Sequence, residues 1–134
     1  MANNVGLHFD GVDDFDKAVD ALIARAEKGA ATFVAKGGLL IEAAAKSRAP
    51  VKTGTLRRSI NVGSISQEGL GRWKSQTYPT TVYSRRIELG FHADDSLGRH
   101  YDQAGRPYLS PGLEDAMGAL HALHEATMAA AMEV

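Results

Sequence analysis

Four cationic side chains lie in the stretch RAPVKTGTLRRSI at residues 48–60, where a long alanine-rich segment stops. They are Arg48, Lys52, Arg57 and Arg58. A phosphate-binding loop needs its lysine directly after a glycine, whereas Lys52 precedes Gly54, so the spacing does not fit. Two interpretations remain open: a contact with nucleic acid, and a joint that positions one surface against another.

Histidines and carboxylates gather at two other places, and both residue types can bind metals. The first group is spread along the chain without a compact spacing: His92, Asp94, Asp95, His100 and Asp102. The second, HALHE at residues 121–125, lacks the H-E-x-x-H order of zinc proteases. No serine lies in a nucleophile-elbow pattern, and Glu88 is the only acid in residues 69–93. We therefore expect no enzyme activity, no metal and no cofactor.

A nucleic-acid contact has more support, because cations interleaved with aromatic rings can hold phosphates and stack on bases. The residues concerned are Arg57, Arg58, Arg72, Lys74, Arg85 and Arg86, with Trp73, Tyr78 and Tyr83. Against this interpretation, the chain has a formal net charge of −1 and contains no helix-turn-helix, zinc-finger or ribonucleoprotein signature. A small nucleic-acid-binding protein stays as an alternative.

Charge is segregated along the 134 residues. Residues 1–45 carry a net −3, residues 46–106 a net +6 and residues 107–134 a net −4. Such unlike patches suit a subunit whose positive middle meets the negative ends of a neighbour. The length fits one domain over residues 1–134, and the absence of cysteine excludes disulfides. No apolar run is long enough for a membrane span or a signal peptide, which predicts a cytoplasmic site of folding.

Hydrophobic periodicity predicts the elements that position these residues. A short edge strand is expected at residues 5–9, followed by a long helix over about 13–47, capped by Asp13 or Asp14 and ended by Pro50. Near Gly37 we expect either a bend or another backbone packed closely. Beyond it, Thr53 or Thr55 caps a short helix whose Leu56 and Ile60 point into the core.

The second half is predicted to alternate between strands and loops before a final helix. Strand character at residues 60–69, with a bulge at Gly63, leads into a hairpin tip or loop at 69–79. A strand through Tyr83 then leads into a helical turn capped by Gly90, and residues 92–107 form an exposed loop. The last helix begins near Ser110, with Pro111 as its first helical residue, and carries one apolar face: Leu113, Met117, Leu120, His124, Met128 and Ala131. The fold class is α+β, with a long N-terminal helix and a C-terminal helix packed on a small antiparallel β-sheet.

Three ordered motifs carry a resemblance to a known family. They are AKSRAPVKTGTLRRSI, VYSRRIELGF and GRPYLSPGLEDA, and together they span roughly residues 44–116. In this order they resemble the neck and tail-completion family of long non-contractile-tailed bacteriophages (siphoviruses). The sequence departs from the family pattern at Lys52 and in a longer polar loop at residues 92–105.

The resemblance implies a non-enzymatic virion protein, assembled in the host cytoplasm. It implies a homo-oligomeric ring, a hexamer, at the head-tail junction, between the head-closure connector and the tail-terminator or tail-tube proteins. DNA would pass through the lumen without sequence recognition, and no membrane is involved. The alternative within this class is a tail-terminator ring. The residues predicted to lie at a subunit or partner interface are Arg48, Lys52, Arg57, Arg58, Arg85, Arg86, Glu88 and Arg106.

Overall fold

The computed structural model describes residue 6 and residues 10–133, so the strand predicted at residues 5–9 falls, apart from Gly6, outside the described residues. The longest element is helix α1, Val12–Arg48. Its N-cap is Gly11 (φ 89°), and Asp13 lies within the first turn, where the helix dipole favours an acid, so the predicted aspartate cap is wrong. The helix ends at the residue before Ala49, as expected ahead of Pro50.

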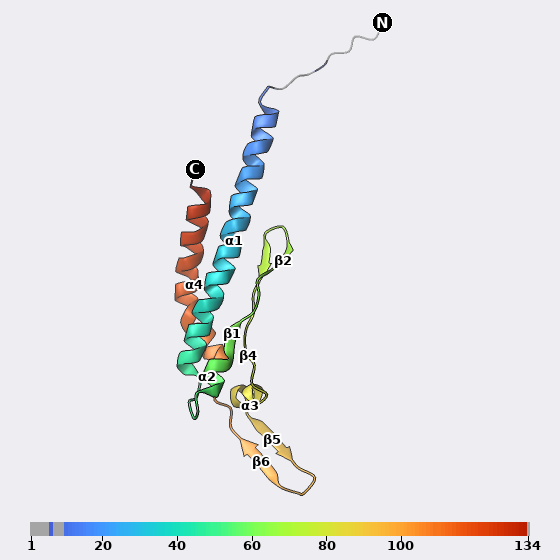
Figure 1. The fold of residues 1–134 in the computed structure, drawn as a ribbon, viewed down its shortest axis with the longest axis vertical. Helices are drawn as coiled ribbons and strands as arrows, with labels where there is room; N and C mark the ends of the chain where they lie inside the picture. Colours follow the sequence, from blue (N-terminus) through green and yellow to red (C-terminus); the bar gives the residue numbers. More distant parts are fainter. Residues whose placement is uncertain (1–5, 7–9, 134) are drawn as a thin grey trace.

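Helix α4, Leu109–Met132, packs antiparallel against α1 (Figure 1). Glycines set this contact: a methyl group placed on Gly29 would lie 3.0 Å from Ala131, and one on Gly112 only 2.8 Å from the Ala45 backbone. Helix α1 continues without interruption through Gly37. The chain does pack closely at Gly37, but the neighbour is the side chain of Leu120 and not another backbone.

The buried face of α4 differs from the predicted one at its N-terminal end. Gly112 and Ala116 are buried against α1, whereas Leu113 and Met117 remain 43% and 42% exposed. Close approach of two backbones needs small residues, so the larger apolar side chains are displaced to the flank of the contact. The helix also starts earlier than predicted, at Leu109, and Pro111 is its third residue, where its missing N–H is still without cost.

A β-ribbon follows α1 and runs back along it (Figure 1). After helix α2 (Thr55–Ser59), strand β1 (Ile60–Val62) pairs antiparallel with β4 (Thr77–Pro79), and β2 (Ser66–Gly69) pairs with β3 (Arg72–Lys74). Of the hairpin tip or loop predicted at residues 69–79, residues 70 and 71 form the tip, whereas residues 72–74 and 77–79 are strands. The irregularity lies between Gln67 and Gly69 rather than at Gly63, whose N–H donates to the Gln76 carbonyl.

The segment after the ribbon differs from the predictions in two places. Tyr83 is not in a strand but is the N-cap of helix α3 (Ser84–Leu89), which Gly90 closes as expected. The predicted loop at 92–107 contains a hairpin, β5 (Phe91–Asp94) with β6 (His100–Gln103). One face carries the rings of Phe91 and Tyr101 and the other carries His–Asp pairs. Strand β5 therefore does alternate apolar and polar residues, but over four residues this pattern is too short to distinguish a strand from a polar loop.

The fold is α+β, as predicted, with its antiparallel sheet divided into three two-stranded ladders. The core is small: Ala45, Ala49, Leu56, Ile60 and Tyr108, with Ile87 and Leu109 packed against it. It sits where the ends of α1, α2 and α4 meet. Within the described residues, no helix is long and apolar enough to cross a membrane.

Candidate subunit interface

The cationic stretch forms a tight joint between α1 and the ribbon. Gly54 adopts the left-handed conformation (φ 78°) and is the N-cap of α2, so the predicted cap at Thr53 or Thr55 is wrong. The Thr53 hydroxyl does accept a 3.4 Å hydrogen bond from the Thr55 N–H. Leu56 and Ile60 are buried as predicted. Arg57 and Arg58 occupy the exposed side of this single turn, and neither forms an ion pair with any described residue. Their charges therefore face solvent in the isolated subunit.

Arg48 has an intramolecular partner. Its Nε and Nη2 donate to the two carboxylate oxygens of Asp115 at 2.6 and 2.8 Å, which ties the end of α1 to the first turns of α4. This bidentate bond, together with the negative charge of Asp115, raises the pKa of Arg48. Both side chains are nearly half exposed, so solvent screens the pair and it contributes little to the stability of the fold.

Glu88 caps helix α4 from α3. One carboxylate oxygen accepts from the backbone N–H groups of Tyr108 and Leu109 at 2.7 and 3.0 Å, and the other from the N–H and hydroxyl of Ser110. Burial raises the pKa of Glu88, but these hydrogen bonds outweigh it, so the pKa lies below its ordinary value. Sequence reasoning missed this role; the only signal was that Tyr108 has no side chain able to cap the helix that follows it.

Lys52 and Arg106, which are far apart in the sequence, line one hollow of about 260 Å³ together with Tyr83 and Ile87. A 2.6 Å hydrogen bond from the Arg106 N–H to the Ile87 carbonyl holds the chain there. The structure therefore gathers most of the predicted cations around the joint.

Arg85 and Arg86 lie on the exposed face of α3. The guanidinium of Arg86 stacks over the ring of Phe91, 4.2 Å from its centroid, so this cation orients the base of the β5–β6 hairpin. Arg85 makes no ion pair with any described residue.

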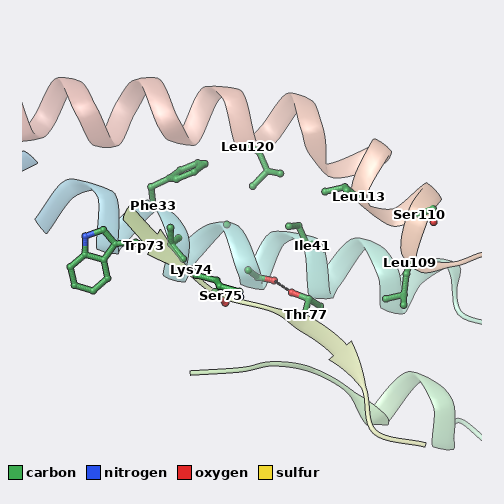
Figure 2. Close-up of a pocket in the computed structure, with 13 residues that line it drawn as sticks. Phe33, Ile41, Trp73, Lys74, Ser75, Thr77, Leu109, Ser110, Leu113 and Leu120 are labelled. Carbon is green, nitrogen blue, oxygen red and sulfur yellow. Dashed lines mark hydrogen bonds between the residues drawn. The ribbon is translucent and has the colours of Figure 1, made fainter. Parts of the chain in front are cut away.

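A second candidate surface is an apolar groove of about 570 Å³ between α1, α4 and the strands β3 and β4. Figure 2 shows Phe33, Ile41 and Leu120 pointing into it from the two helices, with Trp73 at its end. Along its lower edge the Thr77 hydroxyl donates to the Gly38 carbonyl at 3.2 Å, which fixes the strand against α1. Sequence reasoning did not identify this groove, because its lining comes from three distant segments.

Glu27 is another residue whose role the sequence did not reveal. Its carboxylate accepts from the Trp73 indole N–H at 2.7 Å, from the Gln67 amide at 3.0 Å and from the Gly71 N–H. One acid on α1 therefore holds the whole β2–β3 hairpin against the helix.

Comparison with protein families identifies the class of protein that carries these surfaces. Residues 13–90, more than half of the chain, match a family model named HK97-gp10-like and described as "Bacteriophage HK97-gp10, putative tail-component". The chain belongs to the HK97-gp10-like family. No curated protein and no solved structure matches the sequence.

The HK97-gp10-like match covers α1, the joint, the ribbon and α3, and it ends at Gly90. Membership makes the chain a phage structural protein associated with the tail or neck, located in the virion and in contact with other phage structural proteins. Among the described residues of this HK97-gp10-like chain, no three His, Asp or Glu side chains gather in a way that could hold a metal ion.

Proposed function

We propose that the chain forms a homo-oligomeric ring, a hexamer, at the head-tail junction, where it joins the head connector to the tail and lets DNA pass through its lumen. The observation that carries this proposal is the excess of exposed surface. The chain exposes 9830 Å², whereas a compact monomer of 14.3 kDa exposes about 6,800 Å². Nine residues lie outside the described part. Even if they were fully extended, they would account for only about 1,400 Å² of this area, which is less than half of the difference between the two areas.

The excess matches what a ring subunit buries. A subunit in a ring has two neighbours, and a stable interface covers about 800 Å² on each partner. Exposed apolar side chains supply that surface: Phe15 and Leu39 are 67% and 60% exposed, and Leu89 is 67% exposed. A ring also needs heterologous contacts, in which one patch meets a different patch on the next subunit. The cationic joint and the acidic terminal helices provide such unlike patches.

The predicted interface residues at the joint give the test. Reversing Arg57 and Arg58 to Glu should leave the monomer folded, because exposed charges contribute about 0–1 kcal/mol each. Ring closure should fail, because a like-charge contact at a partly desolvated interface costs several kcal/mol and is repeated at every boundary. We expect a normal circular dichroism spectrum and heads that do not join tails in a complementation assay.

The matched control is Arg72→Glu/Lys74→Glu, which makes the same change of charge on strand β3 and should join heads to tails normally. If the Arg57→Glu/Arg58→Glu variant joins them at the wild-type rate, the joint is not an interface. Loss of salt-dependent DNA binding by the isolated variant would instead favour the nucleic-acid alternative. Rings seen on free tails by electron microscopy would favour a tail terminator.

A further inference from the structure

The first three turns of α1 extend beyond the end of α4 and have no covering element among the described residues (Figure 1). Their apolar side chains recur at helical spacing, and all are exposed: Val12, Phe15, Val19, Leu22 and Ile23. They continue the stripe on which Phe33 and Gly37 contact α4 further along the same helix. The apolar helical pattern therefore continues over turns of α1 that no other described element covers.

Acids flank the exposed stripe. Residues 12–24 contain Asp13, Asp14, Asp16 and Asp20 against a single base, Lys17. Asp16 and Asp20 are one helical turn apart and lie along one edge of the stripe. If two copies packed these turns against each other, like charges would meet, so charge disfavours a symmetric helix pair. A basic and partly apolar groove is the complementary surface.

The chain itself carries such a groove, of about 430 Å³, between α1 and α4. Its α1 wall presents Arg25, Lys28 and Lys36, and its α4 wall presents the small side chains Ala126 and Ala130. Neither lysine forms an ion pair with a described residue. The Nε of Arg25 is buried without a hydrogen-bond partner, although its Nη1 donates to the Glu133 carbonyl at 3.0 Å.

We propose that the N-terminal turns of α1, Val12 to Ile23, dock into the groove between α1 and α4 of a second copy of the chain. This rests on the proposed ring and names its subunit contact. Helix and groove match in length, since Val12 to Ile23 and Arg25 to Lys36 each span about 16 Å at 1.5 Å per residue. The small alanines of α4 let a helix approach closely, and the apolar side chains of the docked α1 turns cover them. Beside this apolar contact, Asp16 and Asp20 of one copy pair with Lys28 and Lys36 of the other. The contact is heterologous, so it propagates from subunit to subunit and can close a ring.

A charge exchange between copies tests this docking. One variant carries Asp16→Lys/Asp20→Lys and the other Lys28→Glu/Lys36→Glu, and sedimentation velocity measures the fraction of chain in rings. Each variant alone should lose ring formation at least tenfold at a concentration at which the wild type assembles. An equimolar mixture should recover the wild-type fraction, because in an alternating ring every reversed helix meets a reversed groove.

The control Arg72→Glu/Lys74→Glu reverses two exposed charges on β3, outside both the groove and the α1 turns, and should assemble normally. The docking is wrong if the equimolar mixture stays unassembled. It is also wrong if the Lys28→Glu/Lys36→Glu variant forms rings without the other variant, because the α1 turns would then bind a different phage protein. If the wild type forms rings and neither variant reduces their fraction, the docking is wrong and the proposed ring stands. A wild type that never assembles overturns the ring and the docking together.

Discussion

At the scale of single residues, the side chains that matter most here are acids that satisfy backbone or ring N–H groups across the fold. Glu88 satisfies the first turn of α4, and Glu27 holds the β2–β3 hairpin. Both act between segments that are distant in the sequence. The arginines at the joint differ from these acids. Arg57 and Arg58 form no ion pair with a described residue of the subunit, so their charges can bind a neighbouring subunit.

Glu88→Gln should destabilise the fold by about 1–2 kcal/mol at neutral pH, because the charged acceptor of three backbone N–H groups is lost. The pKa of Glu88 is lowered in the folded state, so its stabilisation is present above the unfolded pKa of about 4.3 and disappears as pH falls through the lower folded value. Urea unfolding at pH 7 should therefore separate variant from wild type, and the difference should shrink below about pH 4. Glu125→Gln, at an exposed position of α4, the helix that Glu88 caps, should show neither effect; a pH-independent loss in Glu88→Gln would contradict the charge argument.

At the scale of elements, the antiparallel packing of α1 and α4 depends on close backbone approach. A methyl group on Gly112 would lie 2.8 Å from the Ala45 backbone, and one on Gly29 or Gly37 would lie 3.0 or 3.1 Å from a side chain of α4. The contact therefore leaves little space at these glycines, and the larger apolar residues lie beside it. Helix propensity would favour alanine at each of these positions, so their packing role outweighs propensity.

Two glycines of α4 separate these effects. Gly112→Ala should destabilise the chain by about 1–3 kcal/mol, because the methyl group would lie 2.8 Å from the Ala45 backbone. Gly118→Ala meets nothing within 4 Å and should stabilise it by about 0.5–1 kcal/mol through helix propensity alone. Thermal unfolding of both variants measures this; equal shifts of the same sign would show that close packing does not define the contact.

At the scale of the whole molecule, the chain is an elongated subunit with a small core between projecting arms (Figure 1). Helix α1 and the β5–β6 hairpin project in opposite directions from that core. Such a shape exposes more surface than its core can stabilise alone, so we expect assembly to contribute to its stability.

The melting temperature should therefore rise with protein concentration, because assembly binds only the folded state. A tenfold increase can add up to about 1.4 kcal/mol per subunit, which corresponds to about 3–5 °C for a chain of this size. Differential scanning calorimetry over a hundredfold range of concentration checks this. The Arg57→Glu/Arg58→Glu variant should show a flat dependence, and a flat dependence in the wild type would contradict assembly-linked stability.

Sequence alone determined the elements whose signals are local. The apolar repeat of α1, its end before Pro50, the turn at Gly54 and the closing of α3 at Gly90 follow from period and backbone chemistry, which neighbouring residues specify. The ordered motifs at residues 44–116 also led to the phage family that the match over residues 13–90 confirms.

Only the tertiary structure decided what depends on contacts between distant segments. It paired Arg48 with Asp115, assigned Glu88 to the start of α4, and placed the side chain of Leu120 against Gly37. It also formed the β5–β6 hairpin, whose four-residue strands are too short for their residue pattern to indicate a strand. The physical reason is the same in each case: hydrogen-bond partners and steric limits are set by which surfaces meet, and a linear pattern of residue types does not contain that information.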